Sequence, residues 1–295
     1  MAHNGESAEG CAQASYPSIV WEKVECKIAH PRFHPVHMST TDREDVTGNG
    51  HDYVAQAAGL ISEGLGTFPK VTGVTAERSV GVAAFGGGGI LGPNEYTLQL
   101  NTDFAGTTST CAGHTGCTVW QQFIYSPDYN VKGEAAVFMQ YWLIGWGSTR
   151  CPSTWTSDGG GDCYKNSAYV AAPDMPITAL SSLTLSGAAV AGGNDTVVFN
   201  NGTTAYSITG PDSVVNISAV WKQAEFNIVG NAGGSRADFN KGSSVTVRLA
   251  LQDGSTSAPT CVANAGSTGE SNNLNLGPCH TASGSSPQIQ FTEAN

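Results

Sequence analysis

Apolar and polar residues alternate along several short stretches of the chain, and residues 221–230 show the pattern most clearly. If this stretch is a strand, its side chains point alternately to two faces. One face is mostly apolar and consists of Lys222, Ala224, Phe226 and Ile228. The other face carries an acid flanked by amides and an indole: Trp221, Gln223, Glu225 and Asn227. The pattern predicts a core-facing side and a polar side that is unusual for scaffolding alone.

Similar short stretches recur from residue 51 to the end of the chain. Strands are predicted over residues 96–101, 119–125, 136–146, 177–189, 196–200, 204–208, 214–229, 236–239, 244–251 and 288–292. We expect Gly66–Val71 to be the start or the edge of a sheet, because Pro69 lacks an N–H donor. Residues 147–176 are expected to form a disulfide-closed loop region. The spacing favours an all-β protein, a two-sheet antiparallel β-sandwich over residues 51–295 with an irregular N-terminal arm over residues 1–50.

The composition narrows the class of protein. Only 13% of residues are charged, whereas glycine alone accounts for 37 positions, which is typical of an extracellular β-protein. No apolar run is long enough to span a bilayer, so we expect no membrane partner. The first residues contain no apolar signal-peptide core, and we interpret them as a start from which any signal peptide has been removed.

The net charge and the spacing of the histidines argue against a nucleic-acid partner and a metal site. The net charge is -11, and nucleic-acid binding requires clustered Lys and Arg, so no nucleic-acid partner is expected. His30, His34 and His37 lie close together, but the interleaved prolines keep the segment extended and no acid stands at ligand spacing. We therefore predict no metal site and no cofactor, and we expect a monomer. A wrapping arm is the preferred interpretation of this segment.

Eight cysteines fall into four pairs that are close in sequence. No Cys-x-x-Cys motif is present, so a zinc site is disfavoured and disulfides are favoured. Disulfides indicate a secreted, extracellular protein. Because each closes a short loop, the preferred pairs are Cys11–Cys26, Cys111–Cys117, Cys151–Cys163 and Cys261–Cys279.

The candidate chemistry centres on Glu225. No Gly-x-Ser-x-Gly motif is present and no free cysteine is expected, so serine and cysteine nucleophiles have little support. A glycosidase needs two acids on neighbouring strands, and the second candidates, Asp238 and Glu134, are weaker. What remains is chemistry driven by one carboxylate and an amide.

Ordered motifs over about residues 52–250 resemble those of the glutamic peptidases, the eqolisins. Gly66-Thr67-Phe68-Pro69 resembles the Gly-x-Phe-x-Val-Pro strand of that family. Phe138-Met139-Gln140 resembles the strand that carries its catalytic Gln, and Ala224-Glu225-Phe226 resembles the strand that carries its catalytic Glu. The resemblance implies a secreted concanavalin-like or jelly-roll-like sandwich in which Glu225 and Gln140 lie on neighbouring strands.

The resemblance also implies a mechanism and a substrate. Glu225 would take a proton from a water molecule that attacks a peptide carbonyl, and the Gln140 amide would donate to the oxyanion. A raised pKa of Glu225 would give an acid pH optimum. The substrate-binding residues would be Trp142, Trp146, Trp221, Gln223, Asn227 and Gln122.

Two other functions remain open on the same residues. A non-catalytic carbohydrate-binding sandwich would stack sugars on Trp142 and Trp221 and bind hydroxyls with amides. A polysaccharide hydrolase or lyase ranks last because a second strand acid is missing. The partner is therefore a polypeptide substrate or, in the alternative, a polysaccharide.

Overall fold

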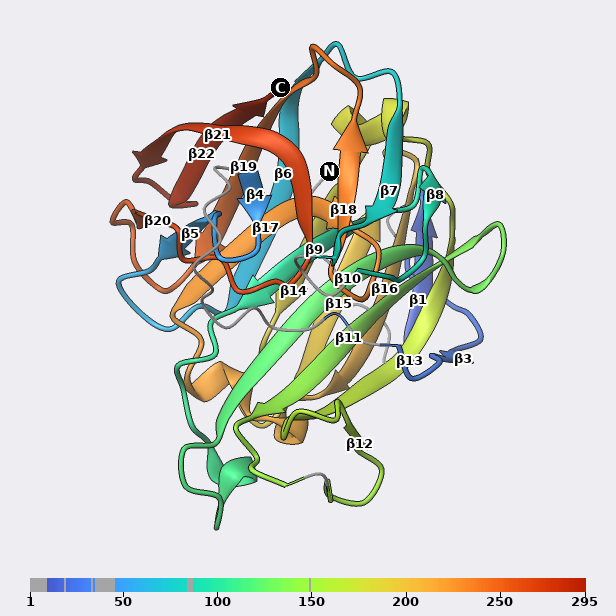
Figure 1. The fold of residues 1–295 in the computed structure, drawn as a ribbon. Helices are drawn as coiled ribbons and strands as arrows, with labels where there is room; N and C mark the ends of the chain where they lie inside the picture. Colours follow the sequence, from blue (N-terminus) through green and yellow to red (C-terminus); the bar gives the residue numbers. More distant parts are fainter. Residues whose placement is uncertain (1–9, 19, 33, 35–45, 84–86, 149) are drawn as a thin grey trace.

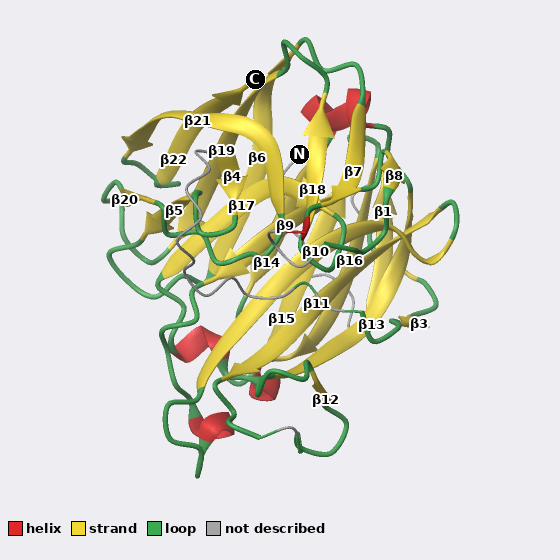
Figure 2. Cartoon of the chain, in the orientation of Figure 1, coloured by secondary structure: helices red, strands yellow, loops and turns green. Residues whose placement is uncertain are grey.

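The computed structural model describes residues 10–18, 20–32, 34, 46–83, 87–148 and 150–295. Within these ranges the chain forms two large β-sheets packed face to face, with 3₁₀ turns as its only helical elements (Figures 1 and 2). The predicted all-β sandwich is confirmed. Among the described helical elements, none is long and apolar enough to cross a membrane.

The larger sheet has thirteen strands. They are β1 (Cys11–Ser15), β2 (Glu22–Lys23), β4 (Val46–Gly48), β6 (Glu63–Thr72), β7 (Glu77–Gly81), β8 (Gly92–Pro93), β14 (Thr184–Ala188), β15 (Asn194–Asn200), β16 (Thr204–Pro211), β18 (Ser235–Phe239), β19 (Ser244–Gln252), β21 (Ser271–Ala282) and β22 (Gln288–Ala294). Their order is β2-β1-β16-β15-β14-β6-β19-β22-β21-β18-β7-β8, and β4 pairs with β21. The pairing is antiparallel except between β18 and β21.

The smaller sheet has nine strands and carries the candidate site. They are β3 (Lys27–Ile28), β5 (Tyr53–Gln56), β9 (Tyr96–Thr102), β10 (Thr118–Val131), β11 (Glu134–Ile144), β12 (Thr156–Ser157), β13 (Cys163–Pro173), β17 (Gln223–Gly230) and β20 (Thr260–Ala263). Their order is β12-β13-β11-β10-β9-β17-β5-β20, and β3 pairs with β13. The 3₁₀ turns are η2 (Ser109–Cys111), η3 (Ile177–Ser182), η4 (Asp212–Val214) and η5 (Ile217–Ala219).

Four local predictions are wrong. The predicted strand 177–189 begins only at Thr184, because η3 occupies the residues before it. Pro69 lies inside β6, which is a central strand and not an edge. On one side the pairing with β19 shifts register opposite residues 246–248, and on the other side the pairing with β14 ends at Thr67. No ladder hydrogen bond therefore requires an N–H at Pro69. Residues 147–176 are not only loop, because β13 pairs along β11. The stretch 214–229 is a strand only from Gln223, after two 3₁₀ turns.

The segment before residue 50 is partly regular in its described residues. β1 pairs with β16 in the larger sheet, and β3 pairs with β13 in the smaller sheet. The first 50 residues therefore contribute to both sheets of the sandwich, and the expectation of an arm that is irregular throughout is wrong. The domain boundary at residue 50 stays a prediction.

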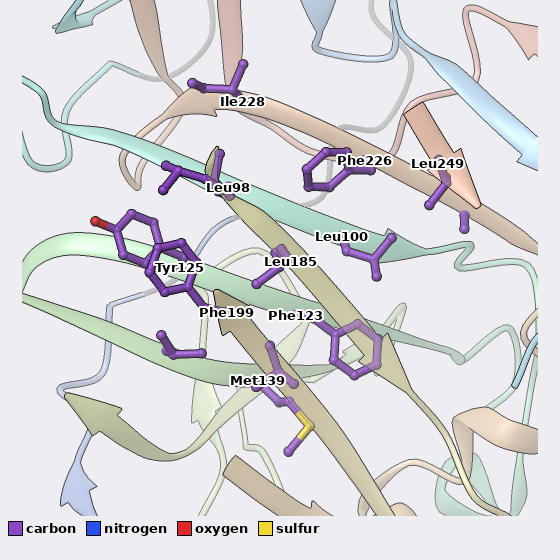
Figure 3. Close-up of a cluster of buried hydrophobic side chains, with 14 of the residues drawn as sticks. Leu98, Leu100, Phe123, Tyr125, Met139, Leu185, Phe199, Phe226, Ile228 and Leu249 are labelled. Atoms are coloured by element: carbon purple, nitrogen blue, oxygen red, sulfur yellow. The ribbon is translucent and has the colours of Figure 1, made fainter. Parts of the chain in front are cut away.

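The main core lies between the two sheets, and Figure 3 shows Phe123 and Phe226 of the smaller sheet within it. Both rings pack against glycines of the larger sheet. A Cβ at Gly66 would lie 2.2 Å from the Phe226 ring, and one at Gly187 would lie 2.3 Å from Phe123. Only glycine leaves room for these rings. This packing fixes the apolar face of β17 inward, so the alternating residues Glu225 and Asn227 lie on the opposite face of the sheet.

All four predicted disulfides are confirmed. Bridges join Cys11 to Cys26, Cys111 to Cys117, Cys151 to Cys163 and Cys261 to Cys279. The first ties the segment before β3 to β1, and the last joins β20 of one sheet to β21 of the other. Both therefore fix elements that border the polar face of the smaller sheet.

Candidate active site

Four polar residues form a continuous row across the smaller sheet. Strand register places Gln140 of β11 opposite Gln122 of β10, Gln122 opposite Asn101 of β9, and Asn101 opposite Glu225 of β17. We call these four residues the polar row. All are at most 1% exposed, because other parts of the chain cover this face of the sheet. Figure 1 shows β21 arching over the strands at the Glu225 end.

Glu225 is held by one of its two carboxylate oxygens. Oε2 accepts hydrogen bonds from the backbone N–H and the hydroxyl of Ser267 at 2.7 and 2.9 Å. It also lies 3.3 Å from the Thr268 N–H and 3.3 Å from Nδ2 of Asn101. Oε1 has no hydrogen-bond partner among the described residues. The carboxylate is thus fixed in orientation with one oxygen left available.

A small pocket opens beside this carboxylate. Its volume is about 120 Å³, which is enough for a few water molecules and too small for a peptide. The lining residues are Val54, Thr102, Asp103, Phe104, Ala105, Gln223, Glu225, Ala265 and Ser267. Gly266 packs against the carboxylate, since a Cβ there would lie 2.6 Å from Oε1 of Glu225.

Other buried acids surround Glu225. Burial raises the pKa of Glu225 above its ordinary value. Burial, followed by the charges of Glu225 and Glu293, raises the pKa of Asp52 well above its ordinary range. Burial raises the pKa of Glu293 to about 7. Nδ2 of Asn227 joins the group by donating to Asp52 at 2.9 Å and lying 3.3 Å from Glu293. The raised pKa of Asp52 therefore favours its protonated form.

The Gln140 end of the row is occupied by the chain itself. Nε2 of Gln140 donates to the carbonyl of Arg32 at 3.0 Å and to Oδ1 of Asn166 at 2.6 Å. Oε1 accepts from the backbone N–H of His34 at 2.8 Å and from the indole of Trp142 at 3.0 Å. Both ends of this amide are fully hydrogen-bonded.

The expectation that Gln140 and Glu225 lie on neighbouring strands is wrong. Both face the same side of the sheet, but β10 and β9 lie between them, a separation of about 14 Å along the sheet. Hydrogen bonds link them indirectly, through Trp142, Gln122, Gln99 and Asn101. The amide directly beside Glu225 is therefore Asn101.

Sequence reasoning missed Asn101, Asp52, Glu270 and Glu293. One signal was available, because Thr97, Gln99 and Asn101 alternate with the apolar residues of β9 in the same way as Gln122 and Gln140 do on their strands. The acids had no comparable signal. Asp52 precedes its strand, and Glu270 lies in a Gly/Ser/Thr-rich stretch that resembles a loop.

Two of the three tryptophans predicted to line a groove do not line one. Trp221 is fully buried in the main core and packs against Phe123, because it precedes the first strand residue and escapes the alternation. Trp142 is 1% exposed and packs against Trp120 and Tyr164. Trp146 is half-buried and stacks on His114. Trp142 and Trp221 are inaccessible to a bound chain or sugar.

The other predicted residues lie in the polar row, near the Glu225 end of this row, or at the margins of the sheets. Gln122 belongs to the polar row, Asn227 contacts the acids, and Gln223 lines the pocket and donates to Gln56 at 2.6 Å. Glu134 pairs with Lys27, and Asp238 pairs with Arg236, so neither is available as a second acid.

The histidines of the N-terminal segment form no metal site in the described residues. His34 lies 3.3 Å from Glu270 and 3.2 Å from Gln99, and His30 contributes its backbone to the contacts around Gln140. His37 lies outside the described residues. Among the residues that the structure describes, no group of His, Cys, Asp or Glu is arranged to hold a metal ion.

The similar proteins found are solved structures. No protein-family model matches the chain, and no curated protein matches it. The chain is similar to the structure of SCP-B, a member of the eqolisin family of peptidases in a complex with the tripeptide Ala-Ile-His, with 10% identity and a TM-score of 0.31. It is also similar to scytalido-glutamic peptidase with a peptide-based transition-state analogue, with 11% identity and a TM-score of 0.33. Each match covers 82% of this chain and 96% of the other.

The resemblance seen in the sequence motifs is thus found again as a distant likeness to glutamic peptidase structures. Because the TM-scores lie below 0.5 and the identities near 10%, we base no statement about activity on them.

Proposed function

We propose that the protein is a secreted, acid-acting endopeptidase in which Glu225 is the general base. The observation that supports this most directly is the asymmetry of its buried carboxylate. Four hydrogen-bonding contacts fix Oε2, whereas Oε1 is buried with no hydrogen-bond partner among the described residues, and Glu225 lines a pocket large enough for water. An oriented carboxylate with one available oxygen is what general-base catalysis requires.

The reaction uses one water molecule. Oε1 of Glu225 takes a proton from this water, the water oxygen bonds to the peptide carbonyl carbon, and the carbonyl electron pair becomes an oxyanion. As the intermediate collapses, the C–N bond breaks and Glu225 returns the proton to the leaving amine. The raised pKa of Glu225 suits this second step in mildly acid solution.

We assign the two amides of the polar row different parts. Asn101, the amide next to Glu225, would stabilise the oxyanion by turning Nδ2 from its present acceptors, Glu225 and Gln99, toward the substrate. Gln140, three strands away, already binds a main-chain carbonyl and a main-chain N–H of residues 32–34. We propose that it holds the substrate main chain instead of acting at the bond that is cleaved.

Secretion is part of the proposal. Four disulfides are stable in an oxidising compartment and are rare in the cytosol. The carbohydrate-binding alternative is not favoured, because Trp142 and Trp221, the residues that would stack sugars, are buried.

The first test is hydrolysis of a denatured protein at several pH values from about pH 4 to pH 7, because the general base must be deprotonated and the pKa of Glu225 is raised. It compares the intact protein with an arm variant, in which residues 27–34 are replaced by a Gly-Ser sequence of equal length, because these residues cover Gln140. In either background we expect Glu225→Gln to lower the rate by about 10²–10⁴-fold. Glu22→Gln, an exposed acid in β2, is the matched control and should leave the rate unchanged.

Thermal unfolding of each variant shows whether the fold is kept. Hydrolysis that is unchanged in Glu225→Gln, or no hydrolysis by the intact protein and the arm variant alike, would overturn the proposal.

A further inference from the structure

Residues 28–32 lie over the smaller sheet with mostly exposed side chains and with their main chain toward the sheet, whereas the His34 side chain is fully buried. Ile28 is 86% exposed, and His30, Pro31 and Arg32 are also exposed. A structural arm is ordinarily fixed by burying apolar side chains. Apolar burial therefore does not explain how this segment, which we call the arm, is held.

Polar side chains of three strands bind the arm through its peptide groups. Nδ2 of Asn130 donates to the carbonyl of Ile28 at 2.7 Å, and Oδ1 of Asn130 accepts from the N–H of His30 at 3.1 Å. The Tyr164 hydroxyl donates to the carbonyl of Pro31 at 2.8 Å. These contacts do not depend on which side chain the arm carries.

The centre of the contact is the carbonyl of Arg32. The Tyr129 hydroxyl lies 2.7 Å from it, Nε2 of Gln140 lies 3.0 Å from it, and Nδ2 of Asn166 lies 3.2 Å from it. Gln140 also accepts from the N–H of His34 at 2.8 Å, so a single side-chain amide binds two peptide groups. Paired donor and acceptor contacts of this kind are how extended peptides are bound without regard to sequence. We call the residues that make these contacts the arm-binding face: Tyr129, Asn130, Gln140, Tyr164 and Asn166.

The arm also has a direction relative to Glu225. His30 lies over Asn166 of β13, and His34 lies beside Gln99 of β9. In the order β13-β11-β10-β9-β17, the arm therefore crosses toward the strand that carries Glu225 and has come within one strand of it at His34. One further strand spacing is about 5 Å, the reach of one or two extended residues.

We propose that the arm-binding face is a substrate subsite that binds extended peptides through their main chain, on the amino-terminal side of the bond to be cleaved. In the described state the main chain of residues 28–32 and of His34 occupies this face and keeps the protein latent. This inference rests on the proposed function for the position of the cleaved bond, but peptide binding at this face does not require catalysis.

The outer side of the arm has room for different side chains. Pro31 and Arg32 border a hollow of about 670 Å³, whose other lining residues are Gly89, Ile90, Asp128, Lys132, Ala232 and Gly233. The guanidinium carbon of Arg32 lies 5.8 Å from the centre of the Tyr129 ring. Peptides that differ at these two positions should therefore bind similarly.

The test measures binding of a fluorescent, end-capped peptide with the sequence of residues 27–34 by fluorescence polarisation. In the arm variant the arm-binding face is free. In the intact protein the arm covers this face in most molecules, and the apparent affinity for the peptide is lowered in proportion to the small fraction that is uncovered. We expect at least about tenfold tighter binding to the arm variant than to the intact protein. Adding Gln140→Leu to the arm variant should abolish the difference, and adding Glu225→Gln should leave it unchanged.

This design separates the two proposals. If the peptide still binds after Glu225→Gln, while neither the intact protein nor the arm variant hydrolyses a protein substrate, the subsite is supported and the peptidase is rejected. Equal binding to the arm variant and the intact protein, or binding insensitive to Gln140→Leu, would overturn the subsite.

A measurement on the intact protein covers the case in which the arm variant fails to fold. Excess isotope-labelled peptide should displace the arm, and amide hydrogen exchange of residues 27–34 should rise while exchange of β10 and β11 stays constant. No rise at saturating peptide would equally overturn the proposal.

Discussion

The two ends of the polar row have the same local design and opposite surroundings. At both ends a buried side chain projects from the polar face of the smaller sheet and is oriented by neighbouring donors. At the Gln140 end both polar atoms of the Gln140 amide are hydrogen-bonded, to neutral side chains and main-chain groups. At the Glu225 end one oxygen has no partner, and two other acids with raised pKa values lie nearby. The difference indicates a binding end and a reactive end.

The sharpest way to break this comparison is to remove the amide at each end. In the arm variant, Asn101→Leu removes the donor beside Glu225 and should lower kcat by about 10²–10³-fold. Gln140→Leu removes a main-chain contact and should raise KM with kcat nearly unchanged. Steady-state kinetics on a peptide substrate measure both. The reverse result, with kcat lost in Gln140→Leu and kept in Asn101→Leu, would exchange the roles of the two ends.

The pH dependence of stability should follow the acids of the reactive end. The pKa of Glu293 is raised from 4.5 to about 7 in the folded protein. The free energy by which protonated Glu293 stabilises the fold is therefore fully present below pH 4.5 and is lost as the pH rises through about 7. A shift of this size corresponds to on the order of 3 kcal/mol. We expect Tm to fall between about pH 5 and pH 8.

Glu293→Gln supplies the control for this prediction. The glutamine stays neutral throughout, so Tm should vary less with pH in this variant than in the parent protein. A parent Tm that rises over the same range would contradict the raised pKa values of the acids at this end.

A smaller effect is expected from adding one methyl group at Gly266. A Cβ there would lie 2.6 Å from Oε1 of Glu225 and 2.9 Å from Cβ of Asp52, so Gly266→Ala must push the carboxylate from its position. We expect a loss of about 1–3 kcal/mol in unfolding free energy, together with reduced kcat. Denaturant unfolding and kinetics measure the two effects. Gly66→Ala, which would press on Phe226 across the apolar face, is the comparison variant and should lower stability without changing the pH profile of activity.

The sequence predicted the architecture because its signals are local. Alternation gave the strands that carry Gln122, Gln140 and Glu225, and close spacing in the chain gave all four disulfide pairs. Alternation also placed Glu225 and Asn227 correctly on the face opposite Phe226. It failed at Trp221, where a 3₁₀ turn precedes the strand and the side chain enters the core.

What the sequence did not predict depends on distant pairing. The order β11-β10-β9-β17 separates Gln140 from Glu225 and brings Asn101 beside the acid, and no local pattern specifies that order. Asp52 and Glu293 meet Glu225 from opposite ends of the chain. The arm was expected to wrap the sandwich, but its main-chain contacts with Gln140 depend on where β3 joins β13.

The bridge between Cys11 and Cys26 has a consequence for any molecule that competes with the arm. It holds the chain one residue before β3, while β1 is itself paired with β16. A segment tethered so close to its own binding face is present there at an effective concentration on the order of millimolar. A free peptide must exceed that effective concentration or bind more tightly than the arm. Reducing this single disulfide would lengthen the tether, lower the effective concentration and make the arm easier to displace.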